Sequence, residues 1–347
     1  MQYIIYPHNG SADHGTEARL RSLLKQLSSL PITLYSESPE EDLRYWPHPF
    51  FTFHRAPMHV PLFPVQDTMV LSFQGDHPLL FPRRIQHPLQ VLLGACLPTS
   101  LPISECVPLF SRYSLLLSYD VQSYHVLRRI HPNVVYCPDP LFMSSPLPFL
   151  LPAPLASHPF VLLSLDPSQA TSGSPLLFDN AIQLIRYLLD TTSLYIALVP
   201  FVCQPHHQDQ ELLDSLYQIF RHSGRILLLP EMTSRRIHYL CDKARFVISA
   251  YPAQTILAYQ SNTPTLLLHD SVRAFSIAHE LFGETRCHIL SPRSLTDDQG
   301  LVRAVRSLIS DERRIRRRLQ EQIPYYQEQT SFFRQSLRAL QAPKKYG

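Results

Sequence analysis

Glycine is scarce in this chain. It occurs 9 times in 347 residues, whereas proline occurs 32 times. Few backbone positions can therefore adopt positive φ without strain, and many loops must be stiff. The glycines of the first loop, Gly10 and Gly15, lack the Gly-x-Gly-x-x-Gly spacing that marks a dinucleotide-binding turn. This absence excludes that class of site at the start of the chain.

Long apolar runs and a strong net charge are also missing. Nowhere does the sequence hold about 18 uninterrupted apolar residues, the length that crosses a bilayer. The start, MQYIIYPHNG, lacks the basic and apolar regions of a signal peptide, so we expect a cytoplasmic protein. The formal net charge is only +3, which argues against nucleic acid or a membrane surface as the partner.

The cysteine and histidine patterns do not predict a metal site. The 6 cysteines are scattered and form no Cys-x-x-Cys pair, so we expect reduced thiols. In the His-rich segment Arg44–Pro64 no two histidines have the spacing of a ligand pair. His206, His207 and Asp209 share one loop, but adjacent side chains seldom point at one ion. We therefore predict no bound metal.

Segment Arg44–Pro64 is also rich in proline and aromatic residues. A proline-stiffened surface loop is the simpler interpretation. The alternative is a loop that faces an acceptor, because aromatic faces stack on sugars and histidine edges bond to hydroxyls.

Two charged segments are expected to face solvent. Pro39–Asp42 is acidic, and five arginines crowd the second half of a helix predicted at Leu301–Gln322. Cations are favoured near a helix C-terminus. Contact with RNA or acidic lipid is the alternative, but aromatic residues do not alternate with these arginines. The arginines are Arg313, Arg314, Arg316, Arg317 and Arg318.

From Arg225 to Gly283, short apolar runs alternate with amphipathic segments, as in parallel α/β units. In this stretch we expect strands at Ile226–Leu229, Phe246–Ser249 and Thr265–Leu268. The helices between and after them are expected at Thr233–Lys243, Pro252–Gln260 and Val272–Phe282. Further strands are predicted at Tyr3–Tyr6, Ile32–Tyr35, Thr68–Phe73, Leu89–Leu93, Ser114–Leu117, Asn133–Tyr136, Phe160–Leu165 and Leu194–Pro200.

The length is sufficient for two domains, each with its own core. A proline-rich tract at 146–159 has the stiffness and low helix propensity of an interdomain linker. We therefore predict a first domain at 1–145 and a second at 160–300, with C-terminal helices at 301–340.

The chain resembles the polysaccharide pyruvyl transferase family over about residues 3–325. The strongest matches are Ala244-Arg245-Phe246-Val247, Thr255-Ile256, Thr263-Pro264-Thr265-Leu266, Ser271-Val272-Arg273 and Ile277–Gly283. Earlier matches are Asn9-Gly10-Ser11, Glu17-Ala18, Asn133-Val134-Val135, Pro138-Asp139-Pro140 and Ile196–Pro200. The resemblance implies a GT-B-like α/β fold, in which two Rossmann-like domains face each other across a cleft. It also implies that the helices at 301–340 pack back toward the first domain.

The reaction that the resemblance implies is ketal formation on a sugar, with phosphoenolpyruvate as donor and no cofactor. Guanidinium groups would hold the carboxylate and phosphate, and histidines suit proton transfer. The donor-site positions that correspond to the family motifs are Tyr119, Phe201, Tyr251, Ala253, Ser271 and Arg273. The corresponding acceptor or cleft candidates are Asn9, Asp13, Glu17 and Asp209.

This chain departs from the family at four of those positions. Tyr119 and Tyr251 stand where the family has arginine, and Phe201 and Ala253 stand where it has histidine. Arg273 keeps a cation. Loss of one charge-assisted bidentate contact typically costs a few kcal/mol. We therefore expect most phosphoenolpyruvate transfer to be lost if no other residues compensate.

Three functions remain open. The first is a pyruvyl transferase-like enzyme of glycan biosynthesis, acting on a glycan or lipid-linked saccharide, with altered donor or acceptor. The second is a pseudoenzyme, a non-catalytic glycan-binding or scaffold subunit. The third is a glycosyltransferase that uses a sugar nucleotide. None of the three requires a nucleic-acid partner.

Overall fold

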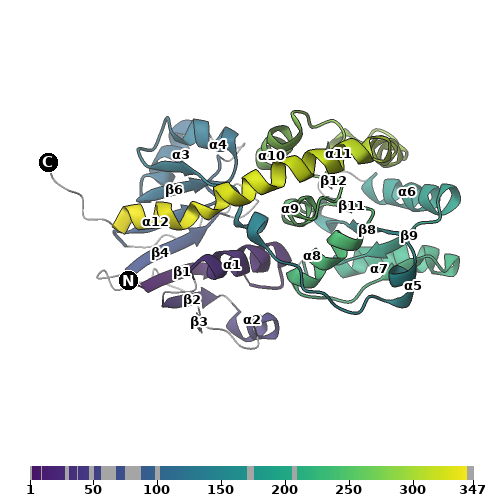
Figure 1. Cartoon of the computed structure of the whole chain (residues 1–347), viewed down its shortest axis with the longest axis horizontal. Helices are drawn as coiled ribbons and strands as arrows, with labels where there is room; N and C mark the ends of the chain where they lie inside the picture. The colour runs from purple at the N-terminus through teal and green to yellow at the C-terminus, as the bar shows by residue number, and fades with distance from the viewer. Residues whose placement is uncertain are drawn as a thin grey trace.

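The computed structural model describes residues 2–8, 10–27, 31–36, 38–46, 51–55, 68–74, 87–97, 102–169, 176–204 and 209–341. These residues form two separate parallel β-sheets, each with helices packed against it (Figure 1). The first has 7 strands in the order β3-β2-β1-β4-β5-β6-β7, and the second has 6 in the order β10-β9-β8-β11-β12-β13. Two Rossmann-like halves were predicted, and the structure confirms this architecture.

The first domain contains the first sheet and its helices. The strands are β1 (Gln2–His8), β2 (Ile32–Ser36), β3 (Thr52–Arg55), β4 (Thr68–Phe73), β5 (Gln90–Leu93), β6 (Leu115–Ser118) and β7 (Val134–Tyr136). The helices are α1 (His14–Leu27), α2 (Pro39–Tyr45), α3 (Ile103–Phe110) and α4 (Val121–Leu127), followed by the 3₁₀ turn η1 (Pro140–Met143).

The second domain contains the second sheet and its helices. The strands are β8 (Phe160–Ser164), β9 (Tyr195–Leu198), β10 (Ile226–Leu228), β11 (Phe246–Ser249), β12 (Thr265–Leu268) and β13 (Ile289–Leu290). The helices are α5 (Ala153–Ser157), α6 (Leu177–Thr191), α7 (Asp209–Phe220), α8 (Ser234–Lys243), α9 (Pro252–Gln260) and α10 (Val272–Phe282). Helices α11 (Gly300–Ser331) and α12 (Phe333–Gln341) follow.

Local sequence explains the ends of several helices. Pro252 begins α9, where a missing N–H costs nothing. Gly283 ends α10 with φ of 76°, the left-handed conformation that glycine adopts without strain. Asp120 caps α4 by accepting a hydrogen bond from the Ser123 N–H.

Several segments differ from the sequence-based expectation. β3 lies inside the segment predicted as a stiff loop, and the short helix α5 lies inside the proline-rich tract. Asp42 was expected to face solvent but is buried. Helix α2 turns the Asp42 carboxylate inward, where it accepts hydrogen bonds from the Ser11 N–H and the Ser36 hydroxyl.

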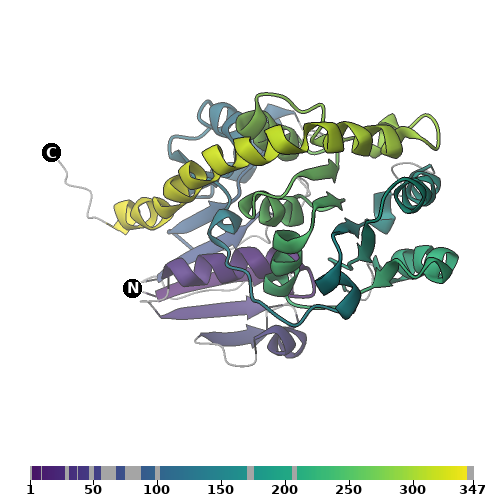
Figure 2. The same cartoon turned by 45° about the vertical axis from the view of Figure 1, so that its right-hand side comes forward.

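The two domains share apolar packing. The core of the second sheet includes Ala18 of α1 together with Leu141 and Phe142 of η1. The core of the first sheet includes Phe333 and Leu337 of α12. Figures 1 and 2 show α11 and α12, in yellow, running across the second domain and onto the first. The C-terminal helices therefore tie the two domains together.

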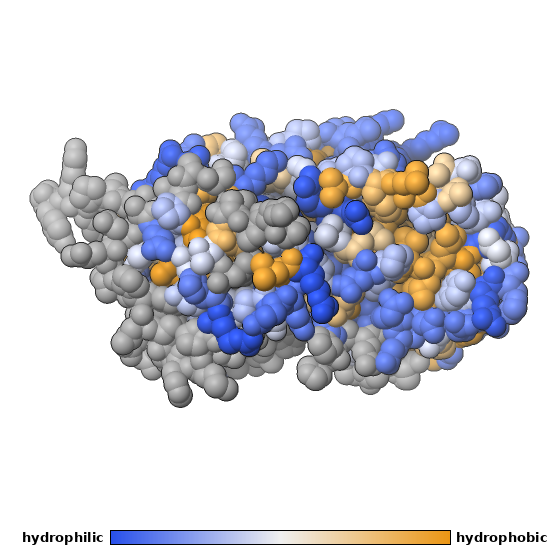
Figure 3. Space-filling model, turned by 90° about the horizontal axis from the view of Figure 1, so that it is seen from below, coloured by the Kyte–Doolittle hydropathy of each residue, from blue (hydrophilic) through white to orange (hydrophobic). Residues whose placement is uncertain are grey.

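Figure 3 shows hydrophobic side chains gathered over the second-domain half of the underside. Among the residues that the structure describes, none of the helices combines the length and the apolar character that a bilayer crossing requires.

Two buried histidines should make the folding stability depend on pH. Burial lowers the pKa of His238 to about 4, although the nearby Asp242 opposes this shift. Burial also lowers the pKa of His288 to about 4. Each histidine is protonated in the unfolded chain below about pH 6.5 but remains neutral in the folded protein. Folding stability is therefore present above that pH and is lost as the pH falls toward 4.

Between pH 6.5 and 4 the protein loses unfolding free energy. We expect the His238→Gln substitution to reduce that loss by on the order of 3 kcal/mol. Urea unfolding measured across that pH range tests this expectation. The exposed His222 provides the matched control. If His238→Gln and His222→Gln show the same pH dependence, burial of His238 is not responsible.

Candidate functional site

The loops at the carboxyl ends of the two sheets meet directly. Ligands of such folds bind at these strand ends. The loop between β1 and α1 forms an antiparallel bridge with the segment after β9, between Asp13 and Val202. The Cys203 N–H donates to the Ala12 carbonyl at 2.8 Å, and the His14 N–H donates to the Phe201 carbonyl at 3.2 Å. The backbones of the two domains are thus hydrogen-bonded to each other at the centre of the expected cleft.

The aromatic rings of Phe201 and Tyr251 pack next to this bridge. Phe201 and Tyr251 stack with ring centroids 5.0 Å apart and planes 27° apart. Their exposed fractions are 1% and 9%. Burial and the neighbouring Asp209 carboxylate hold the pKa of Tyr251 well above 10. The phenol is therefore neutral at physiological pH, and it donates a hydrogen bond to Asp209.

Asp209, the first residue of α7, holds this pair in place. One carboxylate oxygen accepts hydrogen bonds from the N–H groups of Phe201, at 2.9 Å, and Val202, at 2.8 Å. The other oxygen accepts from the Tyr251 hydroxyl. The carboxylate is fully buried and has structural partners on both oxygens.

Ala253 lies where α9 comes close to the start of α1. A Cβ atom added to Gly15 would lie 2.8 Å from the Ala253 Cβ, closer than such atoms approach in real structures. It would also lie 3.5 Å from the Phe201 ring. The absence of a side chain at Gly15 and the small one at Ala253 therefore permit the contact. A histidine at 253 would require the two domains to separate.

Tyr119, Ser271 and Arg273 form a second group. The Arg273 guanidinium lies 5.6 Å from the centroid of the Tyr119 ring and donates to the Gly94 carbonyl. Gly94 has φ of 73°, and a Cβ there would lie 2.9 Å from the Tyr119 ring. Ser271 caps α10 by accepting from the Ala274 N–H at 3.1 Å. Arg273 is therefore buried between the domains, with partners from the first domain.

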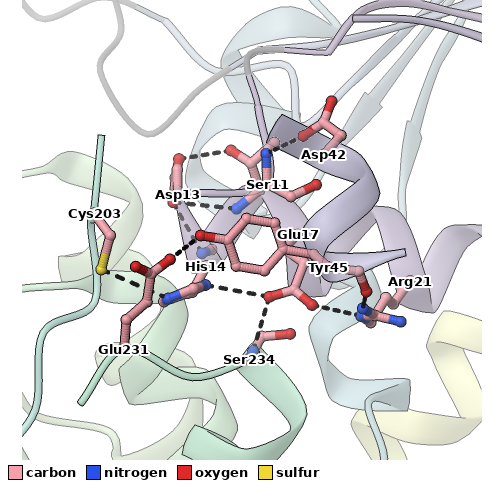
Figure 4. Close-up of polar contacts among 12 residues, drawn as sticks. Ser11, Asp13, His14, Glu17, Arg21, Asp42, Tyr45, Cys203, Glu231 and Ser234 are labelled. Carbon is pink, nitrogen blue, oxygen red and sulfur yellow. Dashed lines mark hydrogen bonds and ion pairs between the residues drawn. The ribbon is translucent and has the colours of Figure 1, made fainter. Parts of the chain in front are cut away.

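Glu17 is completely buried at the same interface (Figure 4). Its carboxylate accepts hydrogen bonds from Arg21 Nε at 2.6 Å and from the Ser234 N–H, across the interface, at 2.8 Å. It also contacts His14 Nδ1 at 3.2 Å. Burial alone would raise the pKa of Glu17, but the His14 hydrogen bond and the Arg21 charge outweigh it and lower the pKa. Glu17 therefore stays ionised.

The remaining cleft candidate that the structure describes is Asp13. Its carboxylate accepts from the Gly15 N–H at 2.9 Å and the Thr16 hydroxyl at 2.6 Å, which opens α1. Asn9 and the histidines at 206 and 207 lie outside the described residues.

Sequence reasoning did not select His14, Tyr45, Cys203 or Glu231, which surround the same point of the interface (Figure 4). Tyr45 of α2 donates a hydrogen bond to the Glu231 carboxylate, and Cys203 Sγ lies 3.9 Å from His14 Nε2. These residues come from four segments far apart in the chain. Their spacing in the sequence therefore contains no signal.

An open cavity of about 390 Å³ lies beside this interface, between α1, α8 and the end of η1. Its lining contains three cations and three serines. The lining residues are Arg21, Ser22, Leu24, Lys25, Trp46, Met143, Ser144, Ser145 and Arg235.

No family model matches this sequence, and no curated protein matches it either. Solved structures do match along nearly the whole chain. The S. aureus MnaA–UDP complex shares 16% identity, with a TM-score of 0.61 over 95% of this chain and 90% of that one. Anabaena HepE, in complex with UDP and glucose, shares 12% identity, with a TM-score of 0.58 over 99% of this chain and 100% of that one.

The Neisseria meningitidis UDP-GlcNAc 2-epimerase bound to UDP-GlcNAc shares 11% identity, with a TM-score of 0.58 over 98% of this chain and 100% of that one. At such low identity the similarity concerns the fold and not the chemistry. It confirms that this chain has a GT-B-like fold.

Proposed function

We propose that this chain is a protein of glycan biosynthesis, related to the polysaccharide pyruvyl transferases, that binds a saccharide without transferring pyruvate. The observation that supports this proposal most strongly is the buried Phe201–Tyr251 stack. It occupies two of the positions where the family has its histidine and arginine. A non-catalytic subunit therefore fits the geometry better than an active transferase.

Phosphoenolpyruvate carries a carboxylate and a phosphate, and each requires a cation. In this chain the only family cation retained at the compared positions is Arg273, which already contacts Gly94 and Tyr119. The compared positions also lack groups that transfer protons. Phe201 and Ala253 do not titrate, and Tyr251 is a buried neutral phenol. Both donor binding and protonation of the enol carbon would be weakened.

The saccharide site in this proposal is the open cavity beside α1. Lys25 Nζ lies 3.3 Å from Ser145 Oγ, and Arg235 Nε donates to the Ser145 carbonyl at 3.1 Å. The Arg21 guanidinium lies 3.9 Å from the centroid of the Trp46 ring. Cations and serine hydroxyls converging on one cavity suit the carboxylates and hydroxyls of an acidic glycan.

Two titrations test the proposal. Phosphoenolpyruvate at millimolar concentration is expected to give neither binding heat nor phosphate release. Polygalacturonate oligosaccharides are expected to bind, and neutral dextran is not. Lys25→Ala and Arg235→Ala should each weaken binding about 10-fold or more. Arg313→Ala removes the same charge from an exposed position and serves as the control. Pyruvyl transfer to a glycan would overturn the proposal.

A sugar-nucleotide enzyme is the second candidate. The similar structures of MnaA and HepE contain UDP and align with at least 95% of this chain. Titration with UDP and UDP-GlcNAc distinguishes the two candidates. Micromolar UDP binding that is lost on Arg273→Ala would favour the second candidate.

A further inference from the structure

Three side chains that bind metals well converge between the two domains. A nitrogen of His14, the sulfur of Cys203 and a carboxylate oxygen of Glu231 all lie within 4.8 Å of one another. His14 begins α1 in the first domain, whereas Cys203 and Glu231 follow β9 and β10 in the second. Figure 4 shows the three side chains directed toward one point.

Glu17 orients the histidine. The Glu17 carboxylate accepts hydrogen bonds from Arg21 and the Ser234 N–H, so it acts as an acceptor for His14 Nδ1 as well. The Nδ1 atom therefore carries the proton. The other ring nitrogen, Nε2, faces the Cys203 sulfur. A buried carboxylate that holds the far nitrogen of a histidine is the usual support of a histidine metal ligand.

We propose that His14, Cys203 and Glu231 bind Zn²⁺ between the domains, with a fourth position for water. Zinc bonds of about 2.0–2.3 Å at tetrahedral angles place ligand atoms roughly 3.5 Å apart. This spacing is close to the 3.9 Å between His14 Nε2 and Cys203 Sγ.

The charge and the surroundings of the cluster suit this ion. A thiolate and a carboxylate together balance the two positive charges of Zn²⁺. On binding, the Cys203 thiol loses its proton to solvent and the sulfur forms the bond to the metal. Tyr45 positions the third ligand, because its hydroxyl donates to the Glu231 carboxylate while its ring packs 5.6 Å from the His14 ring.

The bound ion would connect the two domains through side chains, in addition to the backbone bridge at Asp13 and Val202. It would therefore stabilise the closed arrangement in proportion to its affinity. This inference does not depend on the proposed function. A zinc site is compatible with either an inactive or an active protein.

Cobalt substitution tests the site on the full-length protein. After treatment with a chelator, one equivalent of Co²⁺ is expected to produce the ultraviolet thiolate-to-cobalt charge-transfer band, and Zn²⁺ should displace it. Cys203→Ser should abolish the band, whereas Cys287→Ser should keep it. Glu231→Gln replaces an exposed ligand and should weaken Zn²⁺ binding, measured by chelator competition.

Glu17→Gln retains all three ligands and should weaken Zn²⁺ binding 10- to 100-fold through the orientation of His14. Added Zn²⁺ should also raise the thermal unfolding midpoint of the unsubstituted protein but not that of Cys203→Ser. Absence of a thiolate band at saturating Co²⁺ would overturn the proposal, and so would equal Zn²⁺ affinity in Cys203→Ser and the unsubstituted protein.

Discussion

Replacing Glu17 with alanine is expected to lower the free energy of unfolding by about 3–5 kcal/mol, the usual cost of removing one partner from a buried ion pair. The substitution leaves Arg21 and the Ser234 N–H without their buried acceptor. Because Ser234 belongs to the second domain, the loss weakens the contact between domains as well as α1. Urea unfolding followed by the fluorescence of Trp46, the only tryptophan, measures the change.

The exposed Glu40, paired with Arg55 at 2.7 Å, is the control for this substitution. Glu40→Ala should destabilise the fold far less than Glu17→Ala because solvent screens an exposed pair. The lowered pKa of Glu17 adds a pH signature. Its stabilisation is present above the unfolded value near 4.5 and is lost as the pH falls through the folded value. Equal losses for Glu17→Ala and Glu40→Ala would contradict the assigned role.

Replacing Asp209 with alanine is expected to cost about 3–5 kcal/mol. It removes the carboxylate that accepts from two backbone N–H groups and from the Tyr251 hydroxyl, and each buried N–H left unpaired costs about 1–3 kcal/mol. Tyr251→Phe removes only one of these hydrogen bonds and should cost about 1 kcal/mol. Urea unfolding of both variants gives the comparison.

Glu211→Ala removes a carboxylate from the exposed side of the same first turn of α7. It should cost no more than about 1 kcal/mol, the worth of an acidic residue at a helix N-terminus. If Asp209→Ala is no more destabilising than Glu211→Ala, Asp209 does not hold the aromatic pair in place.

Much of the fold could be predicted from the sequence because the strands are short buried apolar runs. Phe246–Ser249, Pro252–Gln260 and Thr265–Leu268 have the predicted bounds. β3 escaped prediction because Thr52–Arg55 lies at the edge of its sheet and is not an apolar run. α3 escaped because it contains Pro108, a residue that usually ends helices.

The site was less predictable because its residues meet through the fold. Phe201, Tyr251 and Ala253 could be named from the family motifs, but their packing against Gly15 could not. Glu17 was named as a cleft residue, yet its partner Ser234 lies 217 positions away. Likewise, 189 positions separate His14 from Cys203. Local spacing cannot reveal pairs at such separations.

Three of the four positions that differ from the motifs of the resembled family form one packed unit. Phe201 and Tyr251 stack on each other, and the small Ala253 allows α1 to approach them. Tyr119 instead lies against Arg273 in the second group. A single substitution toward those motifs, such as Ala253→His, would therefore disturb the domain contact.

Native-state hydrogen exchange tests most directly whether the two domains stay in closed contact at the expected donor site. The amides of His14 and Cys203 bond across the interface, and those of Phe201 and Val202 bond to Asp209. In peptides covering 10–17 and 199–204 we predict exchange slowed by about a thousandfold or more, an opening free energy of at least about 4 kcal/mol. Millimolar phosphoenolpyruvate should leave this protection unchanged. Exchange at the rate of an unstructured chain, with protection appearing only when phosphoenolpyruvate is added, would contradict the account.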